Sequence, residues 1–239
     1  MSNQQAVTKM FDNISSRYDF LNHLLSFGID QRWRHKTSRL VAKHSPVTIL
    51  DVATGTADLA IRLAKDNPSA QITGIDLSQK MLELGKRKTH KKSLSQQIHL
   101  EIASALEMPF PDNSFDAVTS AFGVRNFENL ETGLREMVRV CRNAGLVAIL
   151  EFSHPTNALV KRLYRWYSRR WIPSVGRNVS KHPTAYSYLP SSVEAFPSGE
   201  AFGGILRKVG LTNIGKKVFN GGIATLYYGY ALKNKPTSQ

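Results

Sequence analysis

The feature that most constrains the fold is a regular alternation of short, β-branched apolar runs with stretches of helical period. The expected strands are residues 47–53, 71–76, 98–103, 115–122 and 145–152. Helical stretches are expected at 57–66, 78–89 and 128–142, and the last of these would place Leu134, Met137 and Cys141 on one apolar face. Such alternation is typical of a parallel sheet whose crossover helices cover both faces.

The C-terminal part has a different pattern. A helix is expected at 198–209, followed by two strand-like runs, 210–219 and 221–232, with only Asn220 and two glycines at their junction. So short a connection predicts an antiparallel hairpin. We therefore expect a Rossmann-like α/β fold, built on a mostly parallel seven-stranded sheet with a C-terminal antiparallel hairpin. Residues 1–239 would form a single domain, to which segments 1–46 and 154–197 are additions.

Composition limits the partners that the chain can have. Its 239 residues suffice for one sizeable core, and the single cysteine, Cys141, excludes an internal disulfide framework or a multi-cysteine zinc site, so no metal is expected. The first residues lack the pattern of a signal peptide, and no apolar run is long enough to span a membrane, which predicts a cytoplasmic protein. A net charge of +14 implies attraction to nucleic acid, a phospholipid surface or an acidic substrate.

A ligand site is indicated where the first two strands end. Asp51 ends the first strand, and a loop containing Gly55 leads to a helix that begins near Asp58. Such a loop lets backbone N–H groups approach a polar ligand at the positive end of a helix. Asp76 ends the second strand, where a carboxylate can accept both hydroxyl groups of a ribose. One glycine is a weak signal, and the loop lacks the lysine and hydroxyl residue of a phosphate-binding P-loop.

Four segments that follow one another along the chain resemble motifs of a known class of enzymes. The runs ILDVATGTADLA, GIDLS, ALEMPFPDNSFDAV and LREMVRV resemble successive motifs of class I methyltransferases. The resemblance implies S-adenosylmethionine as cofactor. It places Asp51, Gly55 and Thr56 at the methionine part, Asp76 at the ribose, and Ser104 with Ala105 at the adenine.

A closer resemblance covers nearly the whole chain. The segments MFDNISSRYDFLNHLLSFGIDQRWR, AFGVRNFEN, LEFSHP, YSYLPSSVEAFPSGEAF and GGIATLYYG resemble the menaquinone/ubiquinone biosynthesis C-methyltransferases. That family implies methylation of a ring carbon of a demethylmenaquinol or a ubiquinol precursor, with a polyprenylated quinol as substrate. A quinol attacks through carbon once a hydroxyl is deprotonated, so the developing anion needs stabilisation.

Catalytic residues are expected at the ends of the fourth and fifth strands. Arg125 and Asn126 follow the fourth strand, and Arg125 would stabilise the anion or hold a water, with a structural loop-capping role as the alternative. His154 is a candidate general base, although the family also places lysine there. Trp33 and Arg34, like Tyr18, Asp19 and Asn22, are expected to close a lid.

Three positions depart from the family pattern. Ala57 replaces the usual glycine after Thr56, which narrows the backbone options of the loop. Ser104 stands where asparagine or aspartate is common, and Ala121 replaces a serine before Phe122. Both changes reduce the side-chain contacts available to the cofactor.

The segment 158–172 bears on whether the partner of this basic chain is a membrane surface. It has helical order, with apolar and aromatic residues on one face and arginines on the other, between Glu151 and Glu194 where no acidic residue occurs. Such a helix could lie on an anionic membrane surface or cover the active site. The alternative functions are an RNA or DNA methyltransferase and a non-catalytic binding module; no appended nucleic-acid-binding pattern is present, and nucleic acid is not expected as a partner.

Overall fold

A computed structural model describes Lys9, Asp12, residues 28–153, Pro155, Arg162 and residues 184–232. Of the predicted features, His154, Tyr18, Asp19 and Asn22 lie outside the described residues, as does the segment 158–172 apart from Arg162. Within the described ranges, no helix is long and apolar enough to cross a membrane.

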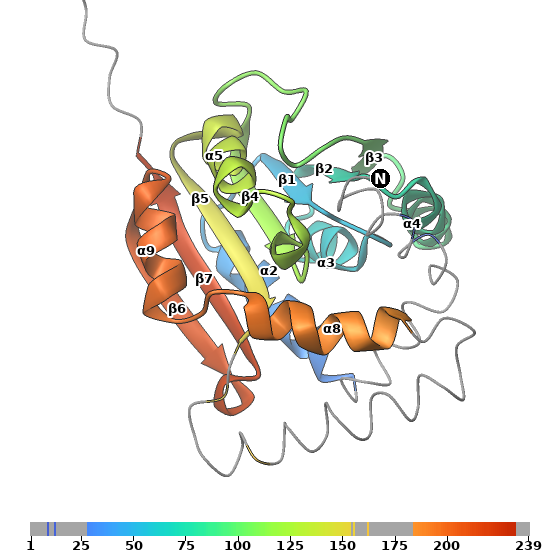
Figure 1. Cartoon of the computed structure of the whole chain (residues 1–239). Coiled ribbons are helices and arrows are strands. Elements are labelled where there is room, and N and C mark those ends of the chain that lie inside the picture. Colours follow the sequence, from blue (N-terminus) through green and yellow to red (C-terminus); the bar gives the residue numbers. More distant parts are fainter. Residues whose placement is uncertain are drawn as a thin grey trace, which may run out of the picture.

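Strands and helices alternate along the described chain (Figure 1). The strands are β1 (Thr48–Val52), β2 (Gln71–Asp76), β3 (Ile98–Ile102), β4 (Phe115–Ala121), β5 (Cys141–Phe152), β6 (Leu211–Phe219) and β7 (Ala224–Ala231). The helices are α2 (Ile29–Ala42), α3 (Asp58–Asp66), α4 (Gln79–Lys91), α5 (Leu130–Val140), α8 (Thr184–Ala195) and α9 (Glu200–Lys208). Two short 3-10 turns, η1 (Val124–Asn126) and η3 (Asn220–Gly222), follow β4 and β6.

The strands form one seven-stranded sheet in the order β3-β2-β1-β4-β5-β7-β6. The first five strands are parallel, whereas β7 pairs antiparallel with both β5 and β6. The predicted fold and its C-terminal hairpin are therefore confirmed, and η3 supplies the short turn. The strand order runs outward in both directions from β1 and β4, and ligands bind beyond the carboxyl ends of strands at such a switch point.

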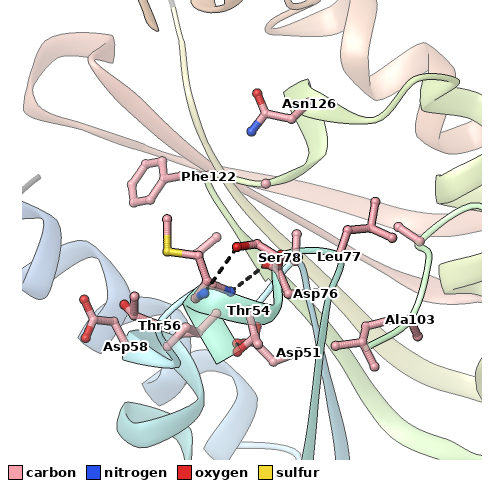
Figure 2. A pocket seen from close by; sticks show the side chains of 18 of the residues that line it. Asp51, Thr54, Thr56, Asp58, Asp76, Leu77, Ser78, Ala103, Phe122 and Asn126 are labelled. Atoms are coloured by element: carbon pink, nitrogen blue, oxygen red, sulfur yellow. Dashed lines mark hydrogen bonds between the residues drawn. The ribbon is translucent and has the colours of Figure 1, made fainter. Parts of the chain in front are cut away.

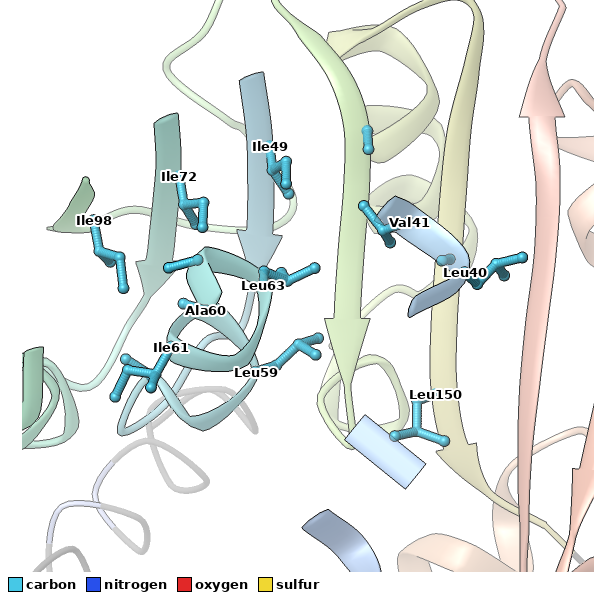
Figure 3. Close-up of a cluster of buried hydrophobic side chains, with 14 of the residues drawn as sticks. Leu40, Val41, Ile49, Leu59, Ala60, Ile61, Leu63, Ile72, Ile98 and Leu150 are labelled. Atoms are coloured by element: carbon cyan, nitrogen blue, oxygen red, sulfur yellow. The ribbon is translucent and has the colours of Figure 1, made fainter. Parts of the chain in front are cut away.

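Two apolar layers cover the sheet, because successive strand residues point to opposite faces. Ile49 packs in one buried cluster with residues of α2 and α3, and Leu50 packs in the other with residues of α5 and α9. Figure 3 shows the first layer, in which Leu59 and Leu63 of α3 face the strands. The expected helices on both faces are confirmed.

Local sequence sets where the helices begin. The Ser78 hydroxyl accepts a hydrogen bond from the Met81 amide at the start of α4, and the Asn129 side chain accepts from the Thr132 amide at the start of α5. Each side chain satisfies one of the backbone donors that a helix N-terminus leaves open. The first cap starts α4 directly after β2, and the second starts α5 after the turn η1 that follows β4.

One element boundary differs from the sequence-based expectation. Cys141 was expected inside the helix 128–142, but α5 ends at Val140 and Cys141 is the first residue of β5. The Cys141 backbone is extended and pairs with Phe115 of β4, while its side chain is fully buried. The apolar period would allow the helix to continue through Cys141, but pairing with β4 makes this residue part of a strand instead.

Candidate functional site

A pocket of about 1000 Å³, including its open mouth, lies beyond the carboxyl ends of β1, β2 and β4. Its described lining comes from the ends of these strands and the loops after them, from the segment after β3, from α2 and from the first turns of α3 and α4. Figure 2 shows the labelled side chains around it, with Asn126 at the opposite end of the view from Asp51. The predicted cofactor residues Asp51, Gly55 and Thr56 all line this pocket.

The loop after β1 has an unusual backbone. Ala53, Gly55 and Ala57 adopt positive φ angles of 54°, 57° and 66°. Glycine tolerates this region, whereas an alanine there is strained. Ala57, the residue that departs from the family pattern, is fully buried and directly precedes α3. Strain of this kind persists where the surrounding structure enforces it, often at ligand sites.

The turn after β4 passes very close to this loop. A Cβ atom on Gly123 would lie only 2.6 Å from the Ala53 Cβ and 3.0 Å from the Ser120 Oγ. Any side chain at position 123 would push the two loops apart. The absence of a side chain at Gly123 therefore allows the turn that carries Phe122 and Asn126 to approach the loop after β1, and both of these residues line the pocket.

Asp76 joins the loops after β1 and β2. Its Oδ2 accepts a hydrogen bond from the Gly55 amide at 2.8 Å, and its Oδ1 accepts from the Ser78 amide at 2.9 Å. Burial raises the pKa of Asp76, and the backbone hydrogen bonds oppose that rise. The predicted ribose acid thus lies in the pocket wall with its orientation fixed.

Asp51 lies deeper than Asp76. It is 1% exposed, and it accepts hydrogen bonds from the Thr54 hydroxyl at 2.7 Å and the Thr119 hydroxyl at 2.9 Å. Burial raises its pKa to about 6, although these hydrogen bonds and the charge of Arg34 act in the opposite direction. A positively charged ligand group in the pocket would restore its ionisation.

Thr56 and the predicted adenine residues differ in how they meet the pocket. Thr56 is buried, and its hydroxyl accepts a hydrogen bond from Lys88 at 3.1 Å, while Lys88 also pairs with Asp58. Ala105 lines the pocket with Ala103 and Leu106. Ser104 is not among the described lining residues; its hydroxyl instead accepts from the Leu106 amide at 3.1 Å. The part of the wall that is predicted to border the adenine is consequently apolar, and Ser104 hydrogen-bonds within the turn behind it.

The predicted catalytic pair, Arg125 and Asn126, is separated by the geometry of η1. Asn126 lines the pocket, but the Arg125 guanidinium turns away to pair with Glu151 at 2.9 Å and to donate to the Phe122 carbonyl. Both partners are buried, with the Arg125 side chain 5% exposed and that of Glu151 0% exposed. Burial raises the pKa of Glu151, and the charge of Arg125 lowers it. Arg125 therefore braces the turn that carries Asn126.

Sequence reasoning did not single out two of the residues at this end of the pocket. Tyr188 of α8 donates from its hydroxyl to Asn126 Oδ1 at 3.0 Å, and burial raises the Tyr188 pKa. Glu151 is the partner of Arg125. A carboxylate within the apolar run of β5 was a signal for Glu151, because buried acids need partners. Tyr188 carried no comparable signal within its segment.

Trp33 and Arg34 were expected to close a lid. Trp33 is 4% exposed and donates from its indole to Asn220 at 2.8 Å, so it belongs to the core beside η3. Arg34 lines the pocket and pairs with Asp30 at 2.6 Å. Of these two neighbours in α2, Trp33 is therefore a core residue and Arg34 is a residue of the pocket wall.

Known proteins resemble this chain over nearly its full length. The model of the ubiE/COQ5 methyltransferase family matches residues 1–231. The demethylmenaquinone methyltransferase of Bacteroides fragilis is 42% identical over 93% of this chain and 91% of its own length. The ubiquinone/menaquinone biosynthesis C-methyltransferase UbiE of Geotalea uraniireducens is 44% identical over 94% of this chain and 96% of its own.

Solved structures share the fold at low sequence identity. A SAM-dependent methyltransferase from Aquifex aeolicus aligns with a TM-score of 0.58 and 20% identity, over 82% of this chain and 89% of its own. The cyclase SpnF aligns with a TM-score of 0.69 and 17% identity, over 98% and 97%. SpnF is named for a different reaction. The likeness therefore identifies the fold, and the reaction must be argued from the residues of the site.

Proposed function

Because the chain belongs to the ubiE/COQ5 methyltransferase family, we propose that it methylates a ring carbon of a demethylmenaquinol or of a ubiquinol precursor. It is an S-adenosylmethionine-dependent C-methyltransferase of quinone biosynthesis. The observation that carries this conclusion is the family match over residues 1–231, which includes segments outside the cofactor motifs. None of the relatives named above points to the alternative, RNA or DNA methylation.

The residues that line the pocket suit this cofactor in polarity. A carboxylate with a fixed orientation, Asp76, stands between the apolar wall at Ala103 and Ala105 and the strained loop at Gly55. When bound, S-adenosylmethionine supplies a methyl group on a positively charged sulfur. Asp76 accepts the ribose hydroxyls, Ala105 contacts the adenine, and Ser104 positions that contact. The loop at Gly55 and Thr56 holds the methionine part, with Asp51 beneath it.

Asn126 is the residue best placed to meet the quinol. Tyr188 holds its amide oxygen at 3.0 Å, which leaves the amide N–H groups as donors toward the pocket. These donors stabilise the negative charge that develops on the quinol oxygen. Arg125 positions Asn126 through η1 and adds a positive charge nearby, which its pairing with Glu151 partly offsets. His154 takes the quinol proton in this proposal, and its placement lies outside the described residues.

The two additional segments cover the substrate side of a single domain. From the first segment, Asp12 accepts a hydrogen bond at 2.5 Å from Ser78, which lines the pocket. From the second, Tyr188 contacts Asn126 as described above. These two contacts support a role for segments 1–46 and 154–197 as a substrate cover that excludes water from the reaction.

The basic segment 158–172 brings the enzyme to its substrate. A quinol with a polyprenyl tail stays in the bilayer, so the enzyme must meet it at the membrane surface. The net charge of +14 favours an anionic surface, and the arginines of this segment would contribute about 1 kcal/mol each near such lipids. The protein would then act in the cytoplasm as a peripheral membrane enzyme.

The deciding experiment is methyl transfer from labelled S-adenosylmethionine. A demethylated quinol in micelles and total RNA are offered separately, and label is expected in the quinol alone. Mass spectrometry then locates the new methyl group on a ring carbon. Label in RNA and none in the quinol would overturn the proposal, and label on oxygen would overturn its C-methylation part.

A further inference from the structure

The charges around the pocket are uneven. The described lining includes three carboxylates, Asp51, Asp58 and Asp76, and one basic side chain, Arg34. Consider a ligand that carries both a positive and a negative group. Within the described lining, Arg34 is the one positively charged side chain that could pair with its negative group. This residue is on α2, in the part of the chain added before the first strand of the sheet.

Arg34 is held in place with hydrogen-bonding capacity left over. Its side chain is 8% exposed, its Nη1 donates to Asp30 Oδ2 at 2.6 Å, and its Cζ lies 5.0 Å from the centre of the Phe122 ring. The buried Nε has no hydrogen-bond partner in the described parts of the chain. A guanidinium offers five N–H donors, and a buried donor without an acceptor is costly. The arrangement suits an anionic acceptor that arrives with the ligand.

The position of Arg34 along the pocket identifies that acceptor. Ala103 and Ala105 mark the adenine end and Asp76 the ribose, so the remaining part of the cofactor extends toward the loop after β1 and toward Phe122. Phe122 contacts Arg34 and lines the same pocket. The amino-acid end of S-adenosylmethionine carries the cofactor's carboxylate. We propose that Arg34 binds this carboxylate, an inference that rests on the proposed function.

A bidentate or charge-assisted contact of this kind is both strong and directional. It would fix the amino-acid end, and with it the sulfur, so that the methyl group faces the turn that carries Asn126. Asp30 contributes by orienting the guanidinium, since it uses only Nη1 in the contact described. Arg34 is thus a cofactor-binding residue that α2 contributes to the pocket.

The test compares two ligands that differ by one group. S-adenosylhomocysteine has the carboxylate, whereas S-adenosyl-3-thiopropylamine is the same molecule without it. Calorimetry on the wild-type protein should show that the carboxylate improves affinity roughly 10- to 150-fold, as expected for one strong charge-assisted contact. In Arg34→Gln this difference should shrink to within a factor of about two to three, while Arg34→Lys should retain part of it.

Two further variants separate binding from folding. Asp30→Asn/Arg34→Gln removes both charges, so no buried carboxylate is left unpaired if the single variant folds poorly. Arg62→Gln is the matched control, because Arg62 also pairs with an aspartate one turn away, Asp66, outside the pocket. It should keep the full carboxylate preference.

A carboxylate preference that persists in Arg34→Gln would overturn the inference, including the case in which the variant weakens the binding of both ligands by the same factor. Wild-type protein that binds neither ligand would instead contradict the proposed function.

Discussion

Asp76 accepts two backbone hydrogen bonds and still faces the pocket, so its replacement has a defined effect. Asp76→Ala would remove the proposed acceptor for the ribose hydroxyls and release the Gly55 amide. We expect the affinity for S-adenosylhomocysteine to fall roughly 10- to 150-fold by calorimetry. Asp66→Ala, which removes an aspartate at the end of α3 outside the pocket, is the control. Unchanged affinity in Asp76→Ala would remove this residue from the site.

We expect Asp51 to make cofactor binding depend on pH. Its pKa is raised to about 6, so the carboxyl of the unbound protein is largely protonated below that pH. The positive groups of S-adenosylmethionine favour the ionised form, and binding therefore lowers the pKa and releases a proton. Affinity should rise between about pH 5 and 7 and then level off. Calorimetry in buffers of different ionisation enthalpy measures the released proton, and an unaltered pH profile in Asp51→Asn would contradict this origin.

At the scale of elements, the contact between α8 and η1 joins a residue of the segment 154–197 to Asn126, which we propose meets the quinol. Tyr188→Phe removes the hydrogen bond that orients the Asn126 amide. One neutral hydrogen bond contributes about 0.5–1.5 kcal/mol, so we expect kcat to fall roughly 2- to 12-fold while the cofactor affinity stays constant. Tyr230→Phe loses a comparable contact with His44, on a different part of the sheet, and should leave kcat unchanged. A loss in cofactor affinity alone would place Tyr188 elsewhere in the cycle.

The same elements show how much of the fold and of the site could be predicted from the sequence. Periodicity predicted the order of strands and helices, and strand ends located Asp51 and Asp76, because parallel strands deliver such residues to one edge. The α5–β5 junction at Cys141 could not be predicted, since one apolar residue suits either element until its pairing with Phe115 is known. Pairings between distant segments, such as Arg125 with Glu151, leave no local pattern.

For the molecule as a whole, excess positive charge predicts its behaviour at lipid surfaces. We expect reversible binding to vesicles that contain anionic lipid, little binding to neutral vesicles, and weaker binding as salt rises. Replacing Arg162, Arg165 and Arg169 by Gln should weaken vesicle sedimentation and leave cofactor affinity intact. In the matched control, Gln replaces Lys86, Arg87 and Lys91 of α4. This control also removes three positive charges, but from another part of the surface. Equal loss in both triple variants would show that net charge alone, and not the segment 158–172, brings the protein to lipid.

The place of β7 between β5 and β6 has a consequence for biosynthesis. A ribosome delivers β5 well before β6 and β7, so the nascent chain carries an unpaired β5 edge until the hairpin emerges. Exposed edges of this kind pair readily with other chains. Trp33, made early, must also wait for Asn220 before its indole finds its partner 187 positions later. The hydrogen bond that ties the helix bearing Arg34 to η3 therefore forms only late in synthesis, and a nascent chain that stops short of the hairpin lacks both this contact and the partner strand of β5.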